Sequence, residues 1–227
     1  VLEVKNINYK EDGIELLKDF SLFVNRTDKI AFVGIEHNSI SALFDIIAGE
    51  KKADSGEFFW GQTIKTTYLP RDNTSYFDND YNITDWLRQY SPDQDDAYVR
   101  GFLGRMLFSG DESLKPVKVL SGGEKVRCML SKLQLSGANV LILDDPTNHL
   151  DLESIQSLNE ALTAFPGVIL FTSHDHEFVQ SIATRIVEIT PKGVIDRMME
   201  FDDYRKDEQV NQLRAQYYEG TGKKIRY

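Results

Sequence analysis

Short apolar runs alternate with longer, more polar segments after residue 139, and this alternation narrows the possible folds sharply. Residues 140–143, 168–172 and 185–189 have the length and composition of buried strands. The intervening residues 152–164 and 176–183 are predicted helices. Strands that are separated by helices predict a mostly parallel sheet with helices on both faces. The chain is therefore predicted to be an α/β protein.

The N-terminal part adds strands of another kind. Residues 2–7 and 20–24 alternate loosely between apolar and polar positions, and they predict antiparallel strands. Residues 29–33 form an apolar strand, and residues 40–48 a predicted helix with apolar positions at helical spacing. Residues 56–69 are again strand-like, with a break at Gly61. An antiparallel β subdomain is expected beside the parallel core.

The middle and the end of the chain define the domain organisation. A polar, turn-rich stretch at 73–80 precedes a mostly helical block, predicted to be a subdomain inserted at about 81–135. The main domain is expected to span 1–201, and the charged residues 202–227 to form a tail or a partial helix. The last five residues, Lys-Lys-Ile-Arg-Tyr, are interpreted as a solvated tail, with an RNA contact as the alternative.

Composition excludes several classes of protein. The formal net charge is −10, so long-range electrostatics give no support for non-specific binding to DNA or to an anionic membrane. No apolar run approaches the roughly 20 residues that span a bilayer, and no basic-then-apolar signal segment is expected before the fold. The single cysteine, Cys128, cannot form an intramolecular disulfide, and no basic cluster activates it. These features suggest a fragment of a soluble, cytoplasmic protein.

The turn after the 29–33 strand lies where a phosphate loop forms, between a strand and a helix. In the pattern G-x-x-x-x-G-K-[ST], backbone N–H groups wrap phosphates, the Lys contacts the outer phosphates and the hydroxyl binds Mg²⁺. Gly34 and Ser41 match this pattern, but Ser39 replaces the second Gly and Ile40 replaces the Lys. On this window alone, an ordinary strand-turn-helix is the more usual interpretation.

The two replacements have a physical cost. Loss of the Lys removes a charge-assisted bond of roughly 1.5–3 kcal/mol. Glu36 adds a carboxylate near the expected phosphate oxygens, although a helix N-terminus still offers free N–H groups. Weak nucleotide binding therefore remains possible at this degenerate loop, whose candidate contact residues are Gly34, Asn38, Ser39, Ile40, Ser41 and Ala42.

Further motifs follow in a fixed order. Leu120-Ser121-Gly122-Gly123-Glu124 precedes a predicted helix and offers N–H groups suited to phosphate. The 140–143 strand leads to Asp144 and Asp145, and the 168–172 strand leads to His174. Each feature alone has an ordinary explanation, as a turn, a solvated acid pair or a hydrogen-bonded histidine. Their joint occurrence in this order is hard to explain by chance.

Together these motifs resemble the ABC ATPases. LSGGE is similar to the family signature, LILDD to its magnesium-binding strand, DPTNHLD to the loop that follows, and TSHD to the histidine switch. The TNHLD form resembles the ABC-F group of soluble tandem-cassette proteins. GRMLFSGDE, LSGGEKVRCMLSKL and ATRIVEITP resemble the second cassette of its YbiT-like branch. The resemblance covers residues 2–204 and implies an ABC nucleotide-binding domain of the P-loop NTPase type.

The resemblance assigns roles to single residues. Asp144 would hold Mg²⁺ through water, and Ser41 would supply its hydroxyl ligand. Asp145 stands where the family has its catalytic Glu, and His174 would contact the γ-phosphate. Asp is one methylene shorter than Glu, and a misplacement of about 1 Å can cost roughly 100-fold in rate. Asp145 is therefore expected to be a poor base.

The changes are concentrated on the nucleotide-facing side of the predicted site. Arg71 stands where the family has a Gln, and Glu11 where it has the aromatic residue that stacks on adenine, with Tyr9 two positions early. Asp151, in the loop between cassettes, would report the state of one site to the other. The signature, by contrast, is intact, and its residues are Ser121, Gly122, Gly123 and Glu124.

The expected function follows from that asymmetry. The resemblance implies ATP and Mg²⁺ as ligands and another cassette, in the same polypeptide, as partner. ATP would be hydrolysed mainly at the site led by the other cassette, and the ribosome or its RNA would be the target. One alternative is a non-hydrolysing structural or regulatory cassette. Another is the ATPase subunit of a membrane transporter, which the TNHLD form disfavours.

Overall fold

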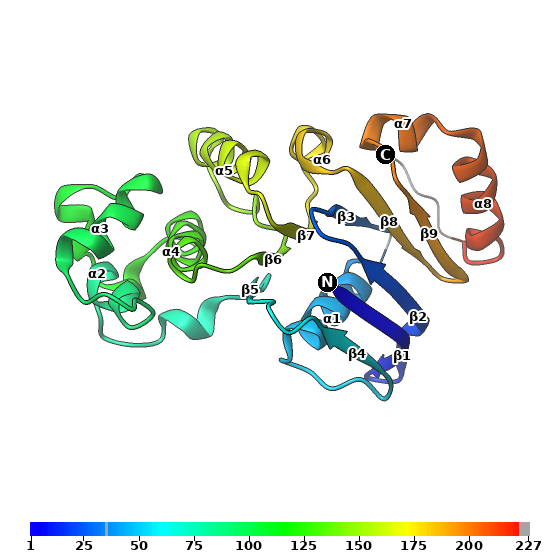
Figure 1. Ribbon diagram of the computed structural model, residues 1–227, viewed down its shortest axis with the longest axis horizontal. Helices are drawn as coiled ribbons and strands as arrows, with labels where there is room; N and C mark the ends of the chain where they lie inside the picture. Colours follow the sequence, from blue (N-terminus) through cyan, green and yellow to red (C-terminus); the bar gives the residue numbers. More distant parts are fainter. Residues whose placement is uncertain (35, 223–227) are drawn as a thin grey trace.

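The computed structural model describes residues 1–34 and 36–222, and its central layer is a six-stranded sheet (Figure 1). The strand order is β5-β6-β7-β3-β8-β9, and neighbouring strands are parallel except for β8 and β9. The strands are β3 (Lys29–Val33), β5 (Thr66–Leu69), β6 (Val140–Asp144), β7 (Val168–Thr172), β8 (Arg185–Thr190) and β9 (Gly193–Arg197). The predicted α/β fold with a mostly parallel sheet is confirmed.

Both faces of this sheet are buried, in two different hydrophobic cores. Successive strand residues point to opposite faces, so Ala31 and Val33 enter one core while Ile30 and Phe32 enter the other. The first core also contains apolar residues of the helices on its face, α4 (Gly122–Leu135), α5 (Leu152–Ala164) and α6 (His176–Ile182). The second core contains those of α1 (His37–Ala48) and of a small second sheet.

The second sheet is the expected antiparallel subdomain. Its order is β2-β1-β4, with β1 spanning Leu2–Glu11, β2 Ile14–Val24 and β4 Ser55–Trp60. β1 and β2 are longer than predicted, because register shifts interrupt the alternation of apolar and polar residues. Asn6 and Asp19 have positive φ angles of 49° and 45° at these irregularities, which hides the strand period in the sequence.

Between β5 and β6 the chain forms a helical region that projects from the sheet (Figure 1). Besides α4, this region contains η1 (Thr74–Phe77), α2 (Ile83–Arg88), α3 (Asp96–Arg105), η2 (Gly110–Leu114) and η3 (Val117–Val119). Trp86 is fully buried, stacks on Phe77 with ring centroids 4.9 Å apart, and donates its indole N–H to the Tyr76 carbonyl at 2.7 Å. This packing joins α2 to η1 and so fixes the helical region to the chain that leaves β5.

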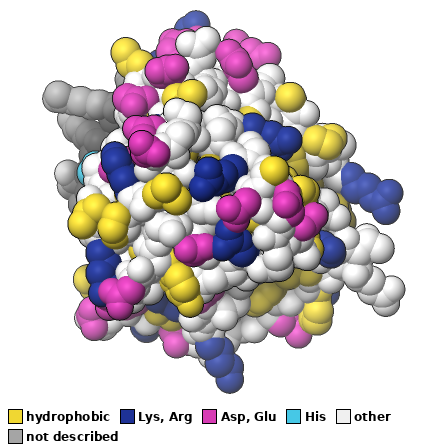
Figure 2. All heavy atoms as spheres, turned by 90° about the vertical axis from the view of Figure 1, so that its left-hand side faces the viewer, with side chains coloured by type: hydrophobic (Ala, Val, Ile, Leu, Met, Phe, Trp, Pro, Cys, Tyr) yellow, Lys and Arg dark blue, Asp and Glu magenta, His cyan; other side chains and the backbone are white. Residues whose placement is uncertain are grey.

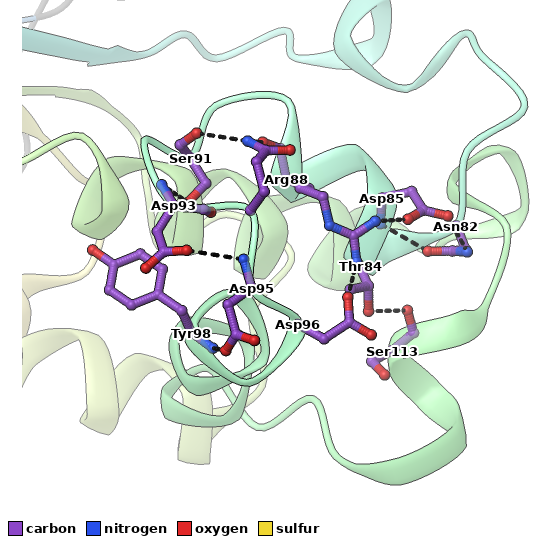
Figure 3. Close-up of polar contacts among 11 residues, drawn as sticks. Asn82, Thr84, Asp85, Arg88, Ser91, Asp93, Asp95, Asp96, Tyr98 and Ser113 are labelled. Atoms are coloured by element: carbon purple, nitrogen blue, oxygen red, sulfur yellow. Dashed lines mark hydrogen bonds and ion pairs between the residues drawn. The ribbon is translucent and has the colours of Figure 1, made fainter.

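Polar contacts complete the helical region (Figure 3). Asn82 caps α2 by accepting the Asp85 N–H at 2.8 Å, and Arg88 forms ion pairs with Asp85 and Asp96. Thr84 joins α2 to η2 through a hydrogen bond to the Ser113 carbonyl at 3.0 Å. On the face that this region presents to solvent, basic and acidic side chains are interspersed, without a broad patch of one sign among the described residues (Figure 2).

After β9 the chain forms two more helices, α7 (Phe201–Lys206) and α8 (Glu208–Tyr218). They pack on the first core, with Tyr204 and Val210 fully buried. The Tyr204 hydroxyl and Arg214 both bind the buried Glu188 carboxylate of β8, at 2.6 and 3.0 Å. The part of 202–227 that the structure describes is thus largely helical. The basic end, 223–227, lies outside the described residues.

Within residues 1–34 and 36–222, every helix is too short or too polar to span a bilayer.

Candidate functional site

The turn after β3 is shorter than a phosphate-wrapping loop. Gly34 directly follows β3 and has a φ of 150°, and a Cβ atom there would lie 2.5 Å from the Ile189 carbonyl oxygen, so only glycine fits. α1 then begins at His37, three residues before the predicted start, and the Ser39 N–H bonds to the Glu36 carbonyl at 3.0 Å. A first helical turn therefore occupies part of the stretch that a phosphate loop leaves open.

This early helix accommodates the replaced residues of the loop. Ser39 lies inside the helix, where its backbone needs no left-handed conformation, and its side chain is buried. Ile40 is 1% exposed and belongs to the second core, as does its helix neighbour Leu43, while Ala42 is buried in the same helix. Asn38 is exposed. The lysine position is thus an apolar core position that carries no charge towards the turn.

Asp144, at the end of β6, has both carboxylate oxygens in use. Ser41 donates its hydroxyl to Oδ2 at 2.6 Å, and the His37 ring bonds to Oδ1 at 2.9 Å. The Asp144 side chain is only 1% exposed. The expected pair of Ser41 and Asp144 is therefore brought together by the fold, although 103 residues separate them in sequence. His37 joins the pair without having been predicted.

Asp145 and His174 also meet, at the ends of neighbouring strands β6 and β7. Asp145 has a positive φ of 56°, and its N–H bonds to the Thr172 carbonyl at 3.1 Å. The ring of His174 is largely exposed, with Nε2 3.8 Å from Asp145 Oδ2. His174 also stacks on His37, with ring centroids 5.5 Å apart. A carboxylate and an imidazole thus face one another at the carboxyl edge of the sheet.

The signature residues form the capped start of α4. Ser121 Oγ accepts the Glu124 N–H at 3.3 Å, and Glu124 in turn accepts the Ser121 N–H at 2.8 Å. Partial burial acts to raise the pKa of Glu124, but its bonds to Lys115 and Ser121 outweigh burial and hold the pKa below its usual value. The turn is therefore fixed by its own polar groups.

His149, in the loop after β6, explains the two glycines of the signature. A Cβ at Gly123 would lie 2.5 Å from the His149 carbonyl oxygen, and one at Gly122 would lie 3.2 Å from the His149 ring. His149 itself adopts a positive φ of 66°. This contact was not predicted, because sequence reasoning assigned His149 no role beyond its place in the TNHLD motif.

Asp151 lies at the start of α5, close to the same turn. Its carboxylate accepts the Ser154 N–H at 2.8 Å, and this bond lowers the pKa of Asp151. Leu152, the next residue, is 85% exposed, and Val119, two residues before Ser121, is 71% exposed. Two large apolar side chains near the signature and the loop are thus open to solvent.

The two remaining candidates differ in their surroundings. Arg71 is exposed and lines a cavity of about 210 Å³ together with Lys125, Asp144 and Asp145. Glu11, at the position of the adenine-stacking aromatic, is bound by Lys51 at 2.8 Å, and Tyr9 donates its hydroxyl to the same carboxylate at 3.1 Å. Glu11 and Tyr9 are therefore engaged in contacts of their own.

Solved structures define the class of this fold. The chain superimposes on an inward-facing ABC transporter of the metal-chelate type with a TM-score of 0.70, at 17% identity, over 95% of this chain and 88% of that one. It superimposes on the dimeric ATP-binding cassette MJ0796, bound to ADP and Pi, with a TM-score of 0.69, at 16% identity, over 83% and 94%. The fold is that of an ABC ATPase domain.

The sequence identifies the family. Residues 17–148 match the model of the ABC transporter family, so the chain belongs to that family. It is 56% identical to the ABC transporter ATP-binding protein YkpA of Bacillus subtilis over 220 residues, which are 96% of this chain and 41% of YkpA. Identity to the ATP-binding protein YbiT of Escherichia coli O157:H7 is 42%, over 92% of this chain and 40% of YbiT.

A third relative is the energy-dependent translational throttle protein EttA of Escherichia coli K12, with 33% identity over 91% of this chain and 38% of EttA. The chain thus spans about two fifths of the length of these relatives. It is an ATP-binding cassette domain with relatives in the ABC-F group. The domains of this family are in general ATPases that bind ATP and Mg²⁺.

Proposed function

We propose that this chain is the second cassette of a two-cassette ABC-F ATPase, and that it acts mainly by completing the ATP site led by the other cassette. The observation that carries this proposal is the contrast between two turns. After β3, a buried Ile40 stands at the lysine position, whereas before α4 the signature turn is intact and capped. The relatives are long enough to hold another cassette beside the matched region.

The signature turn has the properties of a phosphate-binding group. Gly122 and Gly123 are the first residues of α4, and the first N–H groups of a helix have no partner within it. Such N–H groups and the helix dipole favour an anionic ligand. Leu152 and Val119, exposed beside this turn, would lose contact with water when another cassette covers it. These features support the other cassette as the partner.

Contacts within the chain argue against tight binding of Mg·ATP at its own site. Ser41 and Asp144 offer oxygen ligands of the kind that Mg²⁺ accepts, but both oxygens of Asp144 are hydrogen-bonded. Ile40 supplies no charge to a phosphate, and Glu11 is bound by Lys51. The site led by this chain is therefore proposed to be weak or inactive, with Asp145 and Arg71 as further changed positions.

The test compares two substitutions in the full-length protein. Ser121→Arg puts a bulky cation into the signature turn, and we expect it to abolish most ATP turnover. Asp145→Asn alters the carboxylate of this chain's own site, and we expect turnover within about twofold of wild type. Steady-state ATP hydrolysis measures both. Loss of turnover in Asp145→Asn together with full turnover in Ser121→Arg would show that the assignment is reversed.

A second candidate function is a structural or regulatory cassette that takes part in no hydrolysis. The observation that favours it is the number of nucleotide-facing positions that make internal contacts instead, namely Ile40, Asp144 and Glu11. Under this alternative, Ser121→Arg would leave ATP turnover unchanged while still disturbing assembly. Equilibrium binding of Mg·ATP to each site of the full-length protein separates the two candidates.

We propose the ribosome as the target and the cytoplasm as the location. The support is the name of one relative, the energy-dependent translational throttle protein EttA. Sedimentation of the full-length protein with ribosomes, in the presence of ATP, tests this proposal. Co-fractionation with membranes instead would favour the ATPase subunit of a transporter.

A further inference from the structure

The unexpected residue of the site is His37, which contacts Asp144. A buried carboxylate is costly unless hydrogen bonds or a cation compensate it. Asp144 is almost fully buried, and its partners are the Ser41 hydroxyl and the His37 ring, at 2.6 and 2.9 Å. Because a carboxylate only accepts hydrogen bonds, His37 must donate its Nε2–H in this contact. His37 therefore takes a bonding position on a residue that the family uses to hold Mg²⁺.

Three features of the fold hold His37 in this place. α1 begins at His37 rather than at Ile40, which brings the imidazole to the end of β6. The His174 ring stacks on the other side of the imidazole, at 5.5 Å and an interplanar angle of 28°. The positive end of the α1 dipole also lies at this first turn, and it favours a carboxylate there.

We propose that His37 is a built-in replacement for the divalent cation of this cassette. Its imidazole satisfies Asp144 and blocks the position from which Mg²⁺ would join Ser41 and Asp144. The turn after β3 is then complete without Mg·ATP, and the cassette keeps the shape that presents the signature turn. The inference rests on the proposed function.

The first experiment counts nucleotide–metal sites in the full-length protein, with Mn²⁺ as the probe, a non-hydrolysable ATP analogue and electron paramagnetic resonance. Ile40→Lys restores the missing charge. If His37 blocks the site, Ile40→Lys alone gains little, whereas His37→Ala combined with Ile40→Lys gains a second site that is about tenfold tighter or more. His176→Ala combined with Ile40→Lys is the matched control, because His176 binds Asp202 at 2.8 Å, in a different pair.

Each outcome of this count has one meaning. Two tight sites in Ile40→Lys alone, or no gain from removing His37, would overturn the role of His37. Two tight sites in the wild-type protein would instead refute the proposal that this chain's own site is weak. That result would refute the role of His37 as well, whereas one tight site in the wild-type protein and no gain from removing His37 would refute the role of His37 alone, so the two failures are distinguishable.

A second experiment needs no lysine in the buried position 40. Thermal unfolding of the full-length protein is followed in EDTA and in Mg²⁺ alone, without nucleotide. His37→Ala is expected to lower the Tm of this cassette by about 3–10 °C in EDTA, and Mg²⁺ is expected to restore much of the loss. Adding Asp144→Asn should abolish the restoration, because the cation then has no carboxylate to bind. A His37→Ala protein with the same Mg²⁺ response as wild type would contradict the proposal.

Discussion

Gly34, directly after β3, packs closely against the carbonyl of Ile189, and this close approach allows a prediction about stability. Gly34→Ala is expected to lower the free energy of unfolding by about 1–3 kcal/mol, because its φ of 150° strains any L-residue and its Cβ would meet the Ile189 oxygen at 2.5 Å. Denaturant unfolding measures the change. Gly104→Ala is the control, since a Cβ at Gly104 in α3 meets nothing within 4 Å and alanine favours a helix. Equal losses in both variants would contradict this account.

Cys128 allows a prediction that depends on burial alone. The thiol is fully buried in α4, and this burial raises its pKa well above the ordinary value. Because the thiolate is the reactive form, labelling of native protein should be roughly 100-fold slower, or more, than labelling in denaturant. Mass spectrometry of the peptide that contains Cys128 follows the reaction. Rapid labelling of the folded protein would show that α4 opens readily.

Single residues also show where sequence reasoning stops. The sequence motifs predicted four site residues, Asp144, Asp145, Ser41 and His174. The fold places them together, because the ends of neighbouring strands meet at one edge of the sheet. His37 could not be found in this way. It falls in a part of the phosphate-loop pattern that accepts any residue, and its partner lies 107 residues away. Long-range contacts of that kind leave no local signal.

At the level of elements, the start of α4 depends on a reciprocal cap. Glu124→Gln is expected to destabilise the protein at neutral pH by about 0.5–2 kcal/mol, the usual contribution of a cap. The pKa of the Glu124 carboxyl is lowered in the folded protein, so its ionised form stabilises the fold fully at pH values above the ordinary pKa of 4.5. This stabilisation is lost as the pH falls through the lower pKa of the folded state.

The corresponding measurement is urea unfolding of wild type and Glu124→Gln from about pH 7 to about pH 3. The difference between the two proteins should be largest at the upper end and should shrink towards the lower end. Glu160→Gln, an exposed position on α5, is the control and should show a small difference throughout. If the difference in the free energy of unfolding between wild type and Glu124→Gln stayed constant over this pH range, the ionised Glu124 carboxylate would not be what stabilises the cap.

Elements were predictable to different degrees. The strands and helices from β6 to β8 were placed to within about one residue, because dense apolar runs are bounded by polar turns, whereas β9, α7 and α8 were not placed individually. β1 and β2 were predicted to be too short, since bulges interrupt the alternation of apolar and polar residues that identifies a strand. The start of α1 was placed too late, because the residue before His37 is Glu36, which is not a typical capping residue, whereas Asn38 and Ser39, which are typical caps, come just before Ile40.

At the level of the whole molecule, the exposed Leu152 offers a test of assembly. Leu152→Glu is expected to leave the Tm unchanged, since the side chain is 85% exposed, but to lower ATP turnover of the full-length protein by about tenfold. The physical reason is a charge placed on the surface proposed to meet the other cassette. Met198→Glu, at another exposed apolar side chain, is the control and should leave turnover unchanged. Equal activity in both variants would place the contact elsewhere.

The turn after β3 and the turn before α4 belong to helices that lie on opposite faces of the central sheet. α1, with Ile40, shares its interior with the antiparallel strands, whereas α4 shares its interior with α5, α6 and α7 on the opposite side. A substitution that changes the packing of one hydrophobic core therefore need not change the packing of the other. Natural variation could erase the grip on a nucleotide on one side while the surface offered to a neighbour stayed under separate selection.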